Sequence, residues 1–110
     1  MPLREDPLKY LPLSESTYFI LLSLVEPLHG YGVMQKVEEL SQGSVKVGPG
    51  TLYGAFSTLE SEKLIVKVSE VERRKNFTLT EKGRKVLLAQ IQRFEMLTNS
   101  GLEVIDLLNQ

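Results

Sequence analysis

The segment that decides the fold runs from Pro49 to Lys63 and reads PGTLYGAFSTLESEK. Proline is favoured at the first position of a helix, because the N–H that it lacks would have no partner there. Apolar residues then recur at the i, i+3, i+4, i+7 spacing of one helical face: Leu52, Ala55, Phe56 and Leu59. The outward positions are small or polar and uncharged: Thr51, Tyr53, Gly54, Ser57 and Thr58. We therefore predict a helix that packs one face into a core and can lay the other flush against a second surface.

Two helices are predicted before this segment. Residues 1–13 contain three prolines and are interpreted as a lead-in. Ser14 can cap a helix that continues to about Glu26. This helix is apolar on almost every face, which favours a partner surface because so short a chain has little with which to cover it. After a turn at residues 28–30, a second helix is expected as far as about Ser41.

A hairpin and a long helix are predicted after the central segment. Residues 64–71 and 76–80 alternate in part between apolar and polar side chains, so they are expected to form two strands around a charged tip. Thr80 can cap a last helix, whose apolar positions follow the four- and three-residue spacing of a coiled-coil seam. A kink or break is expected near Asn99–Gly101, where this seam is weakest. The alternative to a seam between chains is a helix that packs on its own domain.

The order of these elements is that of a winged helix-turn-helix protein. We predict a mainly α fold with a small β-hairpin and a long C-terminal dimerisation helix. Residues 1–80 would form the DNA-binding domain, and residues 81–110 the dimerisation helix, packed with the first helix in one structural unit. The helix that begins at Pro49 is about 20 Å long, and the major groove of DNA admits a helix.

Composition excludes several classes of protein. The chain of 110 residues fits one domain, and it has no cysteine, one histidine and no apolar run long enough to span a bilayer. Thiolate metal sites and acid–base or nucleophilic catalysis therefore lack candidate residues. The N-terminus has no signal-peptide pattern. We expect a cytoplasmic protein that is not an enzyme and has no cofactor, metal or membrane partner.

Charge is distributed unevenly along the chain. The formal net charge is −1, yet residues 63–85 hold eight basic and three acidic residues, a local net charge of +5. A basic segment on a slightly acidic protein indicates a local anion-binding surface. The alternative is a solvated strand pair and helix start with ordinary charges.

Four short motifs together resemble those of PadR-type transcriptional regulators. LHGYGV at residues 28–33 resembles the start of that family's second helix, and PGTLY at residues 49–53 resembles the opening of its recognition helix. The motifs LE-x-x-x-LI from Leu59 and LT-x-x-G from Leu79 resemble those that flank its wing. The match runs in order across about residues 13–88, and the chain resembles the small members of the family, which have one helix after the wing.

This resemblance implies a homodimer that binds a palindromic promoter site and represses transcription. It also implies dimer contacts from the first and last helices, for which the candidates are Tyr18, Phe19, Leu22, Leu87, Ile91, Phe94, Ile105 and Leu108. Some small members of the family bind flat aromatic compounds at the dimer centre. Because this chain has no tryptophan, Tyr18, Phe19 or Phe94 would have to stack on such an effector.

Ten residues are candidates for contact with double-stranded DNA: Tyr31, Lys46, Gly50, Thr51, Tyr53, Gly54, Ser57, Arg73, Arg74 and Lys75. Thr51 can donate to a phosphate, and Tyr53 can reach a phosphate or a base edge. There are alternatives to DNA contact for both tyrosines: Tyr53 could pack at the rim of the domain, and Tyr31 could pack in the core. The three adjacent basic residues of the wing would contact phosphates or the minor groove.

Two features favour a different function. The chain is slightly acidic overall, and Glu70 and Glu72 stand near the wing tip, where their carboxylates would repel phosphate. The alternative is a winged-helix module for protein interaction that does not bind DNA. The lone histidine, His29, is expected to be structural, as a histidine in a turn usually is.

Overall fold

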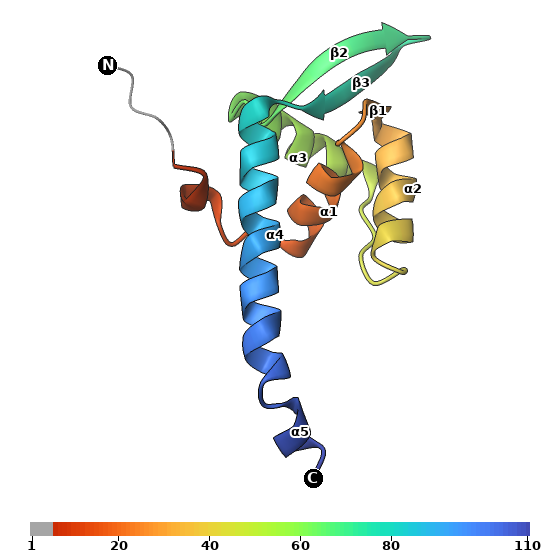
Figure 1. The fold of residues 1–110 in the computed structure, drawn as a ribbon. Coiled ribbons are helices and arrows are strands. Elements are labelled where there is room, and N and C mark those ends of the chain that lie inside the picture. The colour runs from red at the N-terminus through yellow and green to blue at the C-terminus, as the bar shows by residue number, and fades with distance from the viewer. Residues whose placement is uncertain (1–5) are drawn as a thin grey trace, which may run out of the picture.

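The computed structural model describes residues 6–110 and contains the helices and the hairpin in the predicted order (Figure 1). Residues 1–5, the start of the predicted lead-in, lie outside the described residues. The elements are η1 (Pro7–Tyr10), α1 (Glu15–Ser23), β1 (Leu28–His29), α2 (Gly30–Leu40), α3 (Pro49–Ser61), β2 (Ile65–Val71), β3 (Arg74–Leu79), α4 (Glu81–Leu102) and α5 (Ile105–Leu108). The predicted fold class, mainly α with a small β component and a long C-terminal helix, is confirmed.

Both predicted N-caps are present. The Ser14 Oγ accepts a hydrogen bond from the Thr17 N–H at 3.1 Å, at the start of α1. The Thr80 Oγ1 accepts one from the Gly83 N–H at 2.9 Å, at the start of α4. A cap of this kind stabilises a helix by about 1 kcal/mol, because the first N–H groups have no partner inside the helix.

Helix α1 ends earlier than predicted because its last residues turn toward the sheet. It stops at Ser23 and not near Glu26. The carbonyl oxygen of Leu24 accepts hydrogen bonds from two residues of β3, the Leu79 N–H at 3.0 Å and the Thr78 hydroxyl at 2.9 Å. These bonds to a strand distant in sequence outweigh the continuation of the helix.

The sheet has three strands and not the predicted two, in the order β1-β3-β2. Leu28 and His29, predicted as part of a turn, form β1 and pair antiparallel with Phe77 and Asn76 of β3. A hairpin alone leaves the outer edge of β3 without main-chain partners, and β1 supplies them. As a consequence, His29 and the first residue of α2 lie beside the hairpin.

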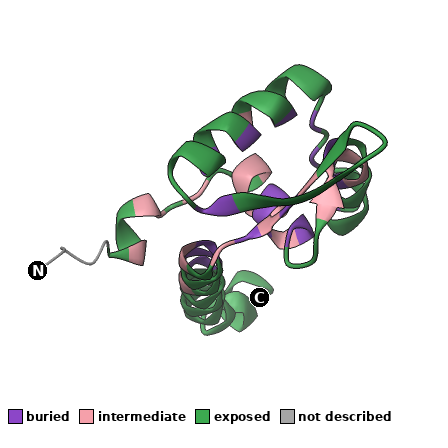
Figure 2. Ribbon diagram, turned by 90° about the horizontal axis from the view of Figure 1, so that it is seen from above, coloured by how far each residue is buried: buried purple, intermediate pink, exposed green. Residues whose placement is uncertain are grey.

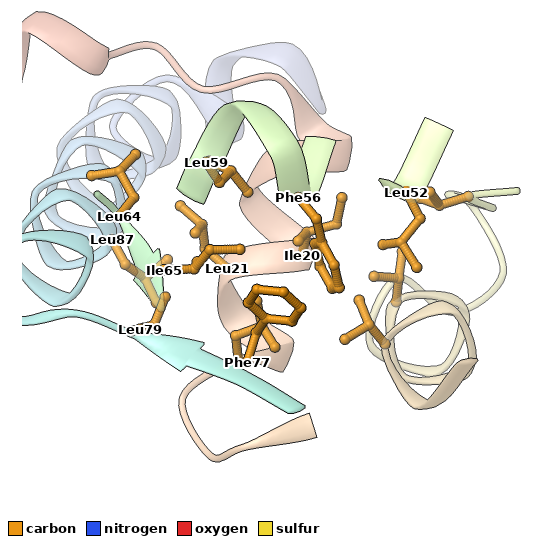
Figure 3. Close-up of a cluster of buried hydrophobic side chains, with 14 of the residues drawn as sticks. Ile20, Leu21, Leu52, Phe56, Leu59, Leu64, Ile65, Phe77, Leu79 and Leu87 are labelled. Carbon is orange, nitrogen blue, oxygen red and sulfur yellow. The ribbon is translucent and has the colours of Figure 1, made fainter. Parts of the chain in front are cut away.

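The core lies where α1, α3 and the sheet meet, and the inward face of α3 is its centre (Figure 3). Leu52, Phe56 and Leu59 are buried as predicted, and Ala55 is partly buried against the same cluster. The ring of Phe56 packs on Phe77 of β3, with ring centroids 5.0 Å apart. Each fully buried side chain of this size stabilises the fold by roughly 1.5–3 kcal/mol, so this stripe anchors α3 firmly.

Only the first part of α4 has buried residues. Gly83, Val86, Leu87 and Gln90 are buried, and every residue from 91 to 110 is exposed (Figure 2). Leu87 was a candidate for the dimer seam, but it is 5% exposed and belongs to the core of its own chain. Leu87 therefore packs within its own chain, because the first turns of α4 lie against the domain.

The break predicted near Asn99–Gly101 occurs slightly later in the chain. Helix α4 continues through these residues to Leu102, and the Asn99 carbonyl oxygen still accepts a hydrogen bond from the Glu103 N–H at 3.3 Å. The chain leaves the helix only at residues 103–104, and α5 follows. Ile105 and Leu108, the last two positions of the predicted seam, therefore lie on a separate short helix and not on α4.

Candidate nucleic-acid interface

The outward face of α3 is exposed over its first half. Its members there are Gly50, Thr51, Tyr53, Gly54 and Ser57. The first turn contains no acidic residue, and the N-cap Gly48 has no side chain that could bond to the first N–H groups. Unpaired N–H groups at the start of a helix favour an anion. This end of α3 is therefore electrostatically suited to a phosphate.

The hairpin formed by β2 and β3 carries the basic residues of the wing. Figure 1 shows it projecting past α3 and the start of α2. It turns at Glu72 and Arg73, whose φ angles are 52° and 67°. Two successive positive φ angles define a type I′ turn, which Asn-Gly adopts most easily. The wing has two charged residues at these positions instead, next to the exposed Arg74 and Lys75.

A cavity of about 460 Å³ lies between the start of α2, α3 and the hairpin. Six of the ten predicted DNA-contact residues line it: Tyr31, Tyr53, Ser57, Arg73, Arg74 and Lys75. The side chains of Arg73 and Lys75 make no hydrogen bond or ion pair with any residue from 6 to 110. Guanidinium, ammonium and hydroxyl groups can all donate hydrogen bonds to an anion, so the cavity has the chemistry of an anion site. We refer to it below as the wing cavity.

The other four predicted residues lie away from the wing cavity. Gly54 lines a separate hollow of about 320 Å³ that faces α1 and the N-terminal segment. Lys46 precedes α3, and its Nζ is 3.9 Å from the Glu38 Oε1 in an exposed ion pair, which contributes little to stability. Gly50 and Thr51 are exposed at the start of α3.

Two polar side chains that line the wing cavity were not predicted as site residues, those of His29 and Glu60. Glu60 follows Tyr53 at i+7 and Ser57 at i+3, so helical spacing alone could have identified it. The His29 Nε2 lies 3.2 Å from the Arg74 Nη1. Sequence spacing could not have found this contact, because it depends on the pairing of β1 with β3.

Tyr53 packs and is exposed at the same time. Its ring lies against Gly30 at the start of α2 and meets Phe56 edge-on, with ring centroids 6.3 Å apart. The residue nevertheless remains 58% exposed, as does Tyr31. The two tyrosines therefore border the wing cavity without belonging to the core.

The predicted dimer contacts form an exposed and a half-buried group. The exposed group lies on α4 and α5: Ile91, Phe94, Ile105 and Leu108. The half-buried group lies on α1: Tyr18, Phe19 and Leu22. The rings of Tyr18 and Phe94 join the two groups edge-to-face, with centroids 4.9 Å apart.

Within residues 6–110, no three His, Asp or Glu side chains gather closely enough to hold a metal ion. No helix of the same range has both the length and the apolar character that crossing a bilayer requires. The wing cavity, with three cations and one carboxylate from Glu60 among its walls, is the most chemically distinctive feature of the described surface.

The sequence is similar to proteins of one regulator family. The model of the transcriptional regulator PadR-like family matches residues 20–89. The transcriptional regulator YqjI of Escherichia coli K12 is 32% identical over 69 residues, which are 63% of this chain and 33% of YqjI. A 37.1 kDa protein in transposon Tn4556 of Streptomyces fradiae is 36% identical over 75 residues, which are 67% of this chain and 21% of that protein. The chain thus matches only a fifth to a third of the length of these relatives.

Solved structures share the fold. A PadR family transcription regulator from Clostridium difficile superposes with a TM-score of 0.72 at 22% identity, over 84% of this chain and 99% of that one. A PadR-like transcription factor from Bacteroides fragilis superposes with a TM-score of 0.64 at 25% identity, over 81% of this chain and 87% of that one. The winged-helix architecture predicted from the order of elements is confirmed by these similarities.

Proposed function

The chain belongs to the PadR-like family of transcriptional regulators, a DNA-binding family without enzymatic activity, and we propose that it binds a palindromic promoter site as a homodimer and represses transcription. Helix α3 would enter the major groove, and the basic wing would contact the adjacent backbone. We also propose that the protein acts in the cytoplasm.

The observation that carries this proposal is the meeting of α3 and the wing around one basic cavity. The 13 residues of α3 span about 20 Å, and the small residues of its outward face let its backbone come close to base edges. Arg73 and Lys75 stand on the opposite wall of the wing cavity, and their side chains have no hydrogen-bond or ion-pair partner among residues 6–110. Free cations at this position can neutralise phosphates and release their counterions.

The homodimer is proposed from the apolar residues that α4 and α5 leave uncovered. From residue 91 onward, nine of them are at least 37% exposed: Ile91, Phe94, Met96, Leu97, Leu102, Val104, Ile105, Leu107 and Leu108. Exposed apolar area costs roughly 25 cal/mol per Å², and contiguous apolar patches usually mark an interface. A second copy would cover this helix. Twofold pairing would aim two α3 helices at one duplex, with half-sites about one helical turn apart.

An aromatic effector at the dimer centre is proposed for the same surface. The Tyr18 and Phe94 rings already form an edge-to-face pair beside the exposed part of α4, and a flat ligand can stack on such rings. It would act by shifting the dimer toward a half-site spacing that the operator does not match. An aromatic compound that binds the dimer and leaves its operator affinity unchanged would contradict this role.

Selection from a pool of random duplexes tests the function directly. We expect enrichment of an inverted repeat, with two chains bound per duplex. The logarithm of the affinity should fall linearly with the logarithm of salt concentration, with a slope of about −0.9 for each phosphate contact. A promoter that contains the selected repeat should be silenced by the protein in a reporter assay. Failure to bind any duplex, even at low salt, would contradict DNA binding altogether.

The alternative function, a protein-interaction module, rests on the acidic residues of the wing. Glu70 pairs across the hairpin with Lys75, and Glu72 is at its tip, so two acidic residues lie on the same hairpin as the three cations. The double variant Arg73→Ala with Arg74→Ala separates the two functions. A lower DNA affinity is expected from the regulator, and an unchanged affinity would favour the interaction module.

A further inference from the structure

Among the three basic wing residues, only Arg74 has a side chain that makes a hydrogen bond to another residue of the range 6–110. Its Nη1 lies 3.2 Å from the Nε2 of His29, a residue 45 positions away. An arginine side chain has donors and no acceptor, and it stays protonated in proteins. The Nε2 of His29 must therefore be the acceptor, and the ring must be neutral with its proton on Nδ1.

The backbone brings His29 to this position. His29 pairs with Asn76 in the sheet, two residues along β3 from Arg74. It also occupies the N-cap of α2, but its side chain makes no cap bond to that helix. The imidazole is therefore held by the sheet and left available to the guanidinium.

We propose that His29 is a positioning residue, which holds the Arg74 guanidinium at the wall of the wing cavity. The remaining N–H groups of the guanidinium can then donate hydrogen bonds to a backbone phosphate of DNA. This inference rests on the proposed DNA binding. A free arginine side chain loses much rotamer freedom when it is ordered on a ligand, and an arginine that is already held loses less. The side chains of Arg73 and Lys75 have no such hydrogen bond, so we expect them to lose more rotamer freedom than Arg74 when they bind a phosphate.

A double-mutant cycle on the selected operator tests the coupling. His29→Ala should lower DNA affinity about three- to tenfold, the loss expected for one hydrogen bond. Arg74→Ala should lower it at least as much and reduce the salt slope by about one phosphate contact. The double variant should bind like Arg74→Ala alone, because each substitution removes the same contact. His29→Gln, whose side-chain oxygen can also accept from Arg74, should restore most of the affinity.

Lys75→Ala is the matched control, because it removes a cation of the same cavity that has no contact with His29. Its effect should add to that of His29→Ala. Additive effects of His29→Ala and Arg74→Ala, or a His29→Ala variant with wild-type affinity, would overturn the inference while leaving DNA binding intact. A wild-type protein that binds no duplex would instead overturn the proposed function.

A second measurement does not depend on the folding of a His29 variant. The chain contains a single histidine, so the ring nitrogens seen by ¹⁵N NMR need no assignment. The wild-type protein should show the proton on Nδ1, and Arg74→Ala should change the Nε2 resonance. A proton on Nε2 in the wild type, or a ring spectrum that Arg74→Ala leaves unaltered, would refute the contact.

Discussion

The ring of Tyr53 lies against Gly30, so that this ring of helix α3 meets the start of α2 where α2 has no side chain. A Cβ added at Gly30 would stand 2.9 Å from the Tyr53 hydroxyl oxygen and 3.2 Å from two ring carbons. The orientation of the candidate DNA-contact tyrosine therefore depends on a glycine 23 positions earlier.

Gly30→Ala should weaken DNA binding several-fold with little loss of stability. The new methyl group must push the Tyr53 ring aside, whereas alanine favours the helix by up to about 1 kcal/mol over glycine. Operator affinity and thermal unfolding measure the two effects. In a Tyr53→Ala background, Gly30→Ala should have no further effect on affinity. A full effect in that background would show that Gly30 does not act through Tyr53.

Gly83→Ala should destabilise the fold by about 1–3 kcal/mol. A Cβ at Gly83 would collide with the carbonyl oxygen of Leu64, and a backbone atom cannot move aside as a flexible side chain can. Gly101→Ala in the same helix is the control, since nothing lies within 4 Å of the Cβ it would add. That control should raise the free energy of unfolding by about 0.5–1 kcal/mol. Equal effects of the two variants in urea unfolding would be inconsistent with this explanation.

Glu72→Asn should raise both the stability and the DNA affinity of the protein. Asparagine tolerates the positive φ of this turn position better than glutamate, which is worth up to about 1 kcal/mol. Removal of the carboxylate also reduces repulsion of phosphate. Glu72→Gln separates the two causes, because it removes the charge but keeps an unfavourable turn residue. It should gain affinity without gaining stability, and a melting temperature that rises equally in both variants would reject the turn argument.

Ile91→Glu should convert the dimer to a monomer and reduce operator affinity at least about tenfold, because one duplex would no longer engage two linked α3 helices. Ile91 is 39% exposed on the first turn of α4 beyond the packed region. Sedimentation equilibrium measures the mass. The neighbouring Gln92→Glu adds the same charge beside it and should leave the mass unchanged. A dimer that survives Ile91→Glu would exclude this stretch of α4 from the interface.

Local patterns in the sequence predicted most of the elements correctly. The N-caps at Ser14 and Thr80, the start of α3 at Pro49 and the inward stripe of Leu52, Phe56 and Leu59 all follow from residues within one or two turns of each other. The predictions that failed depend on distant partners. Helix α1 stops at Ser23 and residues 28–29 form a strand because β3, some 50 residues later, pairs with both.

The candidate site likewise has residues that local sequence patterns predicted and residues that only distant contacts bring together. Helical spacing and a run of basic residues indicated Tyr53, Ser57 and the wing, because both are properties of neighbouring residues. The sequence by itself thus determined which helices form, which face of α3 turns inward and where positive charge gathers. Tertiary structure alone decided that Leu87 is core while Ile91 is exposed, and that His29 meets Arg74. The physical reason is that periodicity identifies a face of an element, whereas only packing in three dimensions selects what lies opposite that face.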